Sequence, residues 1–168
     1  MQDKIRNVKK LICNYDNKNP LNILLWGESG CGKSTLVQLL QKEIPNKKFI
    51  NVNDRLLQFN SKAKREGKKF EDSLHETKAS IRMNYLRIFS EIGSCGQFVF
   101  VMDEADAELN SAYGKDNYLT GKKEINELLE TLKVPVIWIT NHKETIDKSA
   151  CRRFQYSIQF ESLSYSQR

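Results

Sequence analysis

Residues Gly27–Ser34 read Gly-Glu-Ser-Gly-Cys-Gly-Lys-Ser, between an apolar run at Ile23–Trp26 and a helix-like stretch at Thr35–Leu40. The pattern G-x-x-x-x-G-K-S is a phosphate-binding loop, whose glycines allow successive backbone N–H groups to curl around one phosphate. The helix that follows adds the positive end of its dipole. Such a loop needs a strand before it and a helix after it, and the sequence supplies both. The sequence therefore predicts an α/β fold with a nucleoside triphosphate site.

The last residues of this loop have individual roles. Lys33 is expected to reach the β- and γ-phosphates and to neutralise charge during catalysis, and the Ser34 hydroxyl is expected to bind Mg²⁺. We therefore expect ATP and Mg²⁺ as cofactors. The residues expected to contact the nucleotide are Glu28, Ser29, Gly30, Cys31, Gly32, Lys33, Ser34 and Thr35.

The composition restricts the class of protein. With 168 residues, 39% of them hydrophobic, the chain is long enough for one well-packed domain and too short for two ordinary ones. No apolar run approaches the ~20 residues of a membrane span, and the N-terminus lacks the core of a signal peptide. The four cysteines are scattered, which favours reduced thiols in a cytoplasmic protein. The net charge of +6 permits nucleic-acid binding, but the lysines are not gathered into one block.

Five segments rich in β-branched and aromatic residues predict strands. Near-continuous apolar runs such as Phe98–Met102 indicate burial on both faces, as in a parallel sheet between two layers of helices. The predicted fold class is three-layer α/β/α with a five-stranded parallel sheet. The predicted strands are Asn22–Trp26, Lys48–Val52, Gln97–Met102, Val134–Thr140 and Tyr156–Phe160.

Helices are predicted between these strands. In Lys122–Lys133 the apolar residues recur at i, i+3, i+4 and i+7, so this segment should lay one face on the sheet. A longer helix is predicted to run through Ile81–Ile92 and to end at Gly93. The polar stretch Ala107–Thr120 predicts a surface loop.

Two acidic residues follow one of the buried strands. Phe98–Met102 is followed directly by Asp103 and Glu104. At the carboxyl edge of a parallel sheet, Asp103 is expected to lie beside the phosphate-binding loop and to hold Mg²⁺, directly or through water. Glu104 is then placed to orient or deprotonate the water that attacks the γ-phosphate.

Further polar residues follow the next predicted strand. The side-chain amide of Asn141, after Val134–Thr140, is expected to hydrogen-bond the γ-phosphate and the attacking water. Arg152 and Arg153 come after a short predicted helix at Glu144–Ala150. They are expected either to cap that helix through its dipole or to stabilise transition-state charge on a neighbouring subunit's nucleotide.

The order of these motifs resembles that of AAA+ ATPases, which have a P-loop NTPase fold, and most closely that of the AAA subgroup. The likeness covers roughly residues 19–168. This subgroup usually carries a Pro-Gly insert between its two arginines, which this chain lacks, so the resemblance leaves open which arginine dominates. The matching elements are Gly27–Ser34 as Walker A, Phe98–Glu104 as Walker B, Ile137–Asn141 as sensor 1, and Arg152, Arg153 and Phe154 as the arginine-finger turn.

The resemblance also implies features beyond the nucleotide site. It implies self-association into a ring, a hexamer in the family, that acts on a polypeptide. It implies a small helical lid after the core, and Arg168 stands where the family places an arginine at the start of that lid. Residues 1–18 are then an N-terminal helix or linker, and residues 19–168 a core without its lid. Phe70 lies near the family's pore-loop aromatic residue, although a surface-loop role fits it equally well.

Three functions remain open at this point. The leading hypothesis is an ATPase that remodels a protein. A helicase-loader or clamp-loader-like ATPase acting on nucleic acid agrees with the positive charge, but aromatic and basic residues are not interleaved as such binding usually needs. A nucleotide-dependent switch that does not hydrolyse ATP conflicts with the intact Glu104. Asp103–Asp106 also spells the tetrapeptide of DEAD-box helicases, but its short spacing from Lys33 indicates coincidence.

Overall fold

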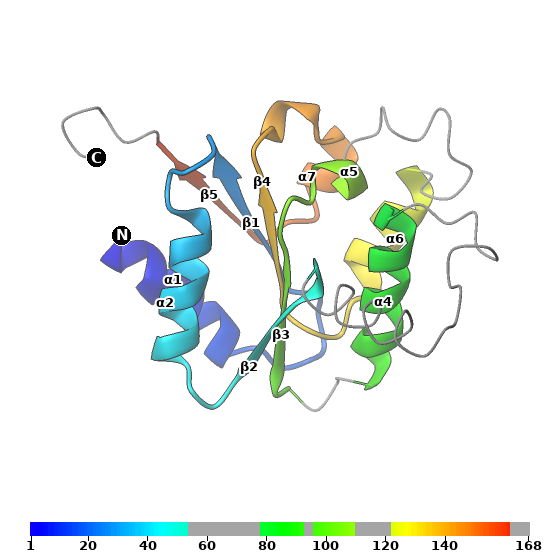
Figure 1. Ribbon diagram of the computed structural model, residues 1–168. Coiled ribbons are helices and arrows are strands. Elements are labelled where there is room, and N and C mark those ends of the chain that lie inside the picture. Colours follow the sequence, from blue (N-terminus) through cyan, green and yellow to red (C-terminus); the bar gives the residue numbers. More distant parts are fainter. Residues whose placement is uncertain (54–77, 93–95, 110–121, 162–168) are drawn as a thin grey trace, which may run out of the picture.

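A single parallel sheet forms the centre of the molecule. The computed structural model describes residues 1–53, 78–92, 96–109 and 122–161. In these residues the sheet has five strands in the order β2-β3-β4-β1-β5, all of them parallel (Figure 1). This confirms the predicted fold class. The strands are β1 (Asn22–Gly27), β2 (Lys48–Asn51), β3 (Phe98–Met102), β4 (Val136–Thr140) and β5 (Tyr156–Phe160).

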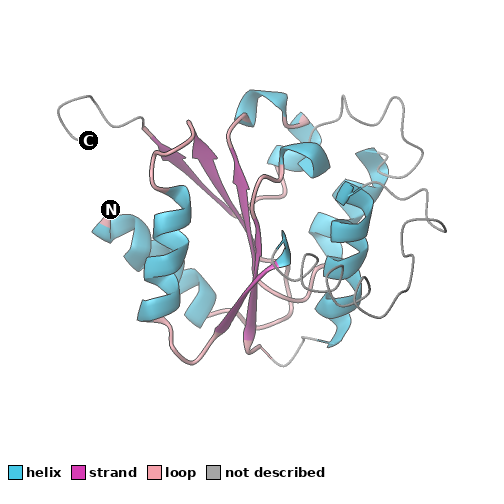
Figure 2. Cartoon of the chain, in the orientation of Figure 1, coloured by secondary structure: helices cyan, strands magenta, loops and turns pink. Residues whose placement is uncertain are grey.

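Helices cover both faces of the sheet, which gives three layers. Figures 1 and 2 show α1 (Gln2–Cys13) and α2 (Lys33–Glu43) on one side, and α4 (Lys78–Ile92) and α6 (Lys122–Thr131) on the other. Three short elements complete the described fold: α5 (Asp106–Leu109), the 3₁₀ helix η2 (Lys143–Thr145) and α7 (Lys148–Cys151). Within the described residues, no helix combines the length and hydrophobicity that a membrane crossing needs.

The central strand β4 explains why the apolar pattern is continuous rather than alternating. All five of its residues are buried, because β3 and β1 flank it and helices cover both of its faces. Its Trp138 is completely buried, and the indole Nε1 donates a hydrogen bond of 3.0 Å to Asn22 Oδ1. The amide of Asn22 in turn donates to the Leu129 carbonyl at 2.7 Å. One buried amide therefore ties β1 to both β4 and α6.

The strand register brings three segments to one edge of the sheet. Trp26 of β1 lies opposite Thr140 of β4, and Met102 of β3 lies opposite Trp138. The residues that follow these three strands therefore leave the sheet at the same carboxyl edge. That edge is where open α/β sheets bind their ligands.

Two predicted segments differ from the structure. The helix expected at Glu144–Ala150 is two short elements, η2 and α7, with Ile146 extended between them. The first three residues of the expected surface loop, Ala107 to Leu109, belong to α5, and both Glu108 and Leu109 are buried. Leu109 packs in the core, and the Glu108 carboxylate contacts a buried arginine of α4, so neither side chain can lie on the surface. The predictions for Phe70, Gly93 and Arg168, and for the rest of the expected surface loop at 110–120, concern positions outside the described residues.

The crowded position of Gly27 at the end of β1 predicts a large loss of stability when this residue is replaced. Its φ is +141°, and a Cβ there would lie 2.2 Å from the Phe160 carbonyl oxygen in β5. Gly27→Ala is therefore expected to lower the free energy of unfolding by about 2–6 kcal/mol, from backbone strain and overpacking together. Urea unfolding followed by circular dichroism measures this change.

Gly30 provides the matched control for this prediction. Its φ is +77°, but a Cβ there meets no atom within 4 Å. Gly30→Ala is expected to cost only the backbone strain, about 1–2 kcal/mol. Equal losses of unfolding free energy in the two variants would show that the close approach to Phe160 adds nothing to the cost of the Gly27 substitution.

Candidate functional site

The phosphate-binding loop leads directly into α2. The helix begins at Lys33, and Gly32 is its N-cap residue with a φ of +97°, a left-handed conformation that favours glycine. Gly32 offers no side chain to cap the helix, and the first bond of the helical ladder runs from Leu36 N–H to the Gly32 carbonyl at 3.0 Å. The N–H groups of the first helical turn therefore remain available to an anion at this end of the dipole.

Lys33 lies at the centre of the site. Its side chain is buried, with 6% of the residue exposed. The ammonium Nζ donates to the Gly27 carbonyl at 2.6 Å, the Glu28 carbonyl at 2.7 Å and Asn141 Oδ1 at 2.9 Å, and lies 3.6 Å from Cys31 Sγ. Among the described residues no carboxylate lies within ion-pair distance of Lys33. A buried charge with only neutral acceptors is costly, so this ammonium favours an anionic ligand.

Ser34 and Asp103 lie on one cavity of about 480 Å³, which α2, β2, β3 and β4 surround. A hydroxyl and a carboxylate are hard oxygen donors of the kind Mg²⁺ prefers, and Mg²⁺ in nucleotide sites takes its other ligands from phosphates and water. Among the described residues there is no cluster of three or more His, Cys, Asp and Glu side chains for a metal. The donor set therefore fits an ion that arrives together with a phosphate ligand.

The turn after β3 holds Glu104 in an unusual conformation. Its φ is +52°, one of two positive values among the described non-glycine residues. The Glu104 N–H donates to Asp103 Oδ1 at 2.9 Å, so the two acids of this turn are linked. Glu104 is exposed at the carboxyl edge of the sheet. A strained residue at such an edge is typical of functional sites.

Asn141 meets Lys33 across the site, and Asp106 fixes the backbone that carries it. Asp106 Oδ1 accepts hydrogen bonds from the Thr140 hydroxyl, from Asn141 N–H at 3.3 Å and from His142 N–H at 3.2 Å. Sequence reasoning gave Asp106 no role. The signal was its position three residues after Asp103, in the first turn of α5, at the same sheet edge as the end of β4.

The two arginines lie in different environments. Arg153 forms an ion pair with Glu130 at 2.6 Å and donates to the Ser149 carbonyl at 2.6 Å, so its guanidinium is held within the chain. Arg152 is exposed, and it has no hydrogen bond or ion pair with any residue that the structure describes.

The backbone of Arg153 lies at the amino edge of the sheet, away from the phosphate-binding loop, and Arg152 directly precedes it. The Arg153 carbonyl accepts from the side chain of Asn22 at 3.5 Å, and Asn22 is the first residue of β1. Gly27, the last residue of that strand, is five residues further on, which corresponds to about 16 Å. The structure therefore brings Lys33, Ser34, Asp103, Glu104 and Asn141 to one edge and leaves the backbone of the arginines at the other.

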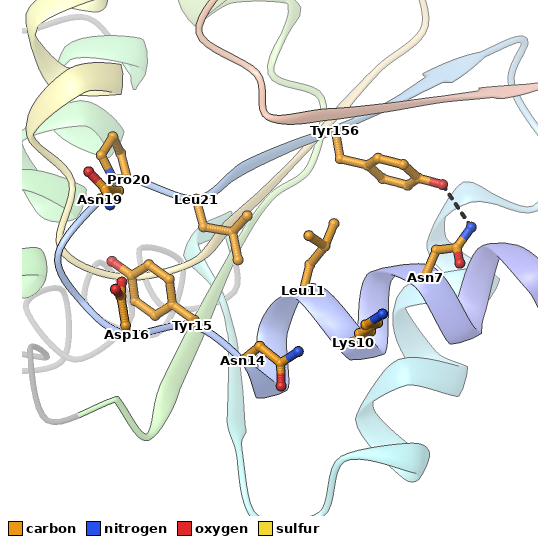
Figure 3. A pocket seen from close by; sticks show the side chains of 10 residues that line it. All are labelled: Asn7, Lys10, Leu11, Asn14, Tyr15, Asp16, Asn19, Pro20, Leu21 and Tyr156. Carbon is orange, nitrogen blue, oxygen red and sulfur yellow. Dashed lines mark hydrogen bonds between the residues drawn. The ribbon is translucent and has the colours of Figure 1, made fainter.

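A second cavity, of about 540 Å³, lies at this amino edge. It opens between α1, the segment that leads into β1, and the start of β5 (Figure 3). Burial, and secondarily the Asp16 carboxylate, raise the pKa of Tyr15 in its wall to about 12, so this phenol stays neutral at physiological pH. Leu21 in its wall directly precedes β1, which separates this cavity from the phosphate-binding loop by the length of the strand.

Comparisons with known proteins agree with this geometry. The model of the ATPase family associated with various cellular activities (AAA) matches residues 23–162. No curated protein sequence gives a match. The FIGL-1 AAA domain in complex with ADP superposes with a TM-score of 0.58 at 17% identity, over 99% of this chain and 53% of that one. Trip13 in the Escherichia coli MS115-1 HORMA:CdnC:Trip13 complex gives 0.60 at 14% identity, over 99% and 63%. The chain thus spans between half and two thirds of these structures.

Proposed function

The chain belongs to the AAA family of ATPases, and on that basis we propose that it binds ATP with Mg²⁺ at the phosphate-binding loop and hydrolyses the γ-phosphate. The observation that carries the proposal is the Lys33 ammonium, which is buried, is hydrogen-bonded only to neutral acceptors, and lies at the N-terminus of α2. Phosphate oxygens would replace the Gly27 and Glu28 carbonyls as its acceptors. The helix N-terminus would then share the charge of the β-phosphate.

The other residues at this edge would have separate roles in the reaction. Ser34 and Asp103 would hold Mg²⁺, which when bound neutralises charge on the β- and γ-phosphates. Glu104 would orient the attacking water and accept its proton. Asn141, which is already within hydrogen-bond distance of Lys33, would donate its amide N–H to the γ-phosphate or to that water. Glu28, Ser29, Gly30, Cys31, Gly32 and Thr35 would surround the phosphates through their backbone.

We further propose that the site is completed by a second copy of the chain. Arg152 is exposed and unpaired among the described residues, and it directly precedes Arg153, whose carbonyl lies at the start of β1, a strand length from the phosphate-binding loop. It is therefore the better candidate for an arginine that acts on a neighbour's nucleotide, while Arg153 holds α7 against α6 through Glu130. This arrangement suits a ring, and we propose a hexamer.

The proposed substrate is a polypeptide in the cytoplasm. A structural neighbour, Trip13, was solved in a HORMA:CdnC:Trip13 complex, which supports a protein partner rather than a nucleic acid. The free thiols of Cys13, Cys31 and Cys151 agree with a reducing compartment. Salt-dependent binding to single- or double-stranded DNA would instead favour the alternative of a loader that acts on nucleic acid.

Lys33→Met tests nucleotide binding. Methionine keeps the length and burial of the side chain but removes the charge, which we expect to weaken ATP binding by about 30-fold or more, equivalent to at least about 2 kcal/mol. Titration with a fluorescent ATP analogue measures the dissociation constant. Lys42→Met, at an exposed lysine near the end of the same helix, is the matched control and should bind normally. Equal affinities in both variants would contradict the proposed site.

ATPase activity against protein concentration then separates a hydrolysing enzyme from a nucleotide-dependent switch. We expect the specific activity to rise steeply with concentration, because neighbouring copies complete each site. A specific activity that is measurable but flat would show that each copy is catalytically complete. Binding without any turnover over the whole range would favour the switch.

A further inference from the structure

Arg82 is a buried arginine on α4, on the face of the sheet opposite α2. Only 3% of its side chain is exposed, in the second turn of the helix Lys78–Ile92. Arginine does not give up its proton in proteins, and a buried guanidinium costs several kcal/mol unless its donors are matched. Burial lowers the pKa of Arg82, against the opposing effects of Glu108, Glu104 and Asp103. The groups that contact this guanidinium therefore indicate why a charge is buried at this position.

The guanidinium binds the backbone of the Glu104 turn. One terminal nitrogen donates to the Asp103 carbonyl at 2.6 Å, and the other lies 3.5 Å from the Glu104 carbonyl. Its Nε lies 3.2 Å from the buried Glu108 carboxylate on α5. A second side chain, Asn53, also donates to the Asp103 carbonyl, at 3.1 Å. Arg82 therefore contacts two successive carbonyls of one turn and the short helix that follows it.

The turn needs such support because its conformation is unfavourable. A φ of +52° at Glu104 costs of order 1–3 kcal/mol for a residue that is not glycine. The carbonyl of Asp103, just before the Glu104 N–H, and the carbonyl of Glu104 itself both point toward the guanidinium. Asn53 also holds the first of these peptide groups, and the Ala105 N–H of the second donates to the Ile139 carbonyl at 2.8 Å, but among the described residues only Arg82 contacts both carbonyls with a charged donor. Loss of the guanidinium would therefore weaken the restraint on both peptide groups, and a rotation toward an ordinary conformation would move the Glu104 side chain away from the phosphate edge.

We propose that Arg82 is a positioning residue that holds the Asp103–Glu104 turn, and through it the Glu104 carboxylate, in the geometry that hydrolysis needs. This inference rests on the proposed function, in which Glu104 orients the attacking water. It connects α4, which lies on the other side of the sheet from α2, to the site (Figure 1). Since α5 also carries Asp106, the same short helix links Arg82 to the backbone of Asn141.

The kinetic test compares two variants. Arg82→Met alone leaves the buried Glu108 carboxylate without its guanidinium and risks unfolding, so we combine it with Glu108→Gln. Glu108→Gln alone is the control, because it keeps both contacts of Arg82 with the turn. We expect the double variant to lose about 10- to 100-fold in kcat, as a misplaced catalytic group does, with an ATP dissociation constant within about threefold of the control. An unchanged kcat in the double variant would overturn the proposal.

A second readout does not depend on turnover. A positive φ brings the N–H and Hα protons of one residue close together, so Glu104 should show a strong intraresidue N–H to Hα nuclear Overhauser effect in the wild type and in Glu108→Gln. We expect a weak one in the double variant, and an unchanged one would overturn the proposal. If the wild type does not hydrolyse ATP but this signal depends on Arg82, the proposed hydrolysis fails while the positioning of the turn stands.

Discussion

Replacing Arg152 with alanine is expected to lower the kcat for ATP hydrolysis by about 10³- to 10⁵-fold, the range measured for arginines that reach a neighbour's nucleotide. The reason is electrostatic, because charge that spreads over the γ-phosphate in the transition state would lose the cation that the neighbouring copy supplies. Nucleotide binding by the isolated copy should be unchanged, since Arg152 directly precedes Arg153, whose carbonyl contacts Asn22 at the far end of β1 from the phosphate-binding loop. Steady-state turnover at saturating ATP measures the effect.

Mixing two inactive variants tests whether the arginine acts between copies. Arg152→Ala keeps an intact nucleotide site, and Lys33→Met keeps an intact Arg152. We expect each to be inactive alone and the mixture to recover activity. Lys148→Ala, at an exposed residue of the same short helix, is the control and should behave as the wild type. A mixture that stays inactive would contradict action between copies, and a larger loss in Arg153→Ala would assign the role to Arg153.

Glu104→Gln is expected to lower kcat by about 10²- to 10⁴-fold while ATP remains bound, because the amide keeps the size of the side chain but cannot accept the proton of the attacking water. Quenched-flow measurement of product formation, with nucleotide retention on a desalting column, distinguishes slow chemistry from weak binding. Glu127→Gln, at an exposed glutamate of α6, controls for the loss of one negative charge. Normal hydrolysis by Glu104→Gln would remove Glu104 from the mechanism.

The parts of this structure that could be predicted from the sequence are those set by local pattern. The apolar run of β4 and its neighbours predicts a parallel sheet, because only strands covered on both faces read as continuous hydrophobic segments. The phosphate-binding loop motif predicts the strand that precedes it and the helix that follows it. Since parallel strands end at one edge, the same reasoning predicts that Lys33 and Asn141 approach one another, and their side chains are 2.9 Å apart.

The parts that could not be predicted depend on contacts between distant segments. Asp106 is an ordinary acidic residue in the sequence, and only the pairing of β3 with β4 places its carboxylate beneath the backbone of Asn141. Arg82 lies within a helical pattern that gives no sign of a buried charge. The two adjacent arginines are likewise equivalent in the sequence, and they differ because Glu130 of α6 and the Ser149 carbonyl lie beside Arg153.

The separation of Arg152 from the phosphate-binding loop gives each copy two unlike ends, one that supplies the arginine and one that receives it. Contacts between unlike ends are heterologous, so copies join head to tail rather than as symmetric pairs. An open row of n copies then contains n − 1 completed sites, and its first or last nucleotide always lacks a donor. Only closure of the row supplies every site. The stoichiometry of active sites per copy, measured by the burst of product in the first turnover, would therefore report ring closure directly.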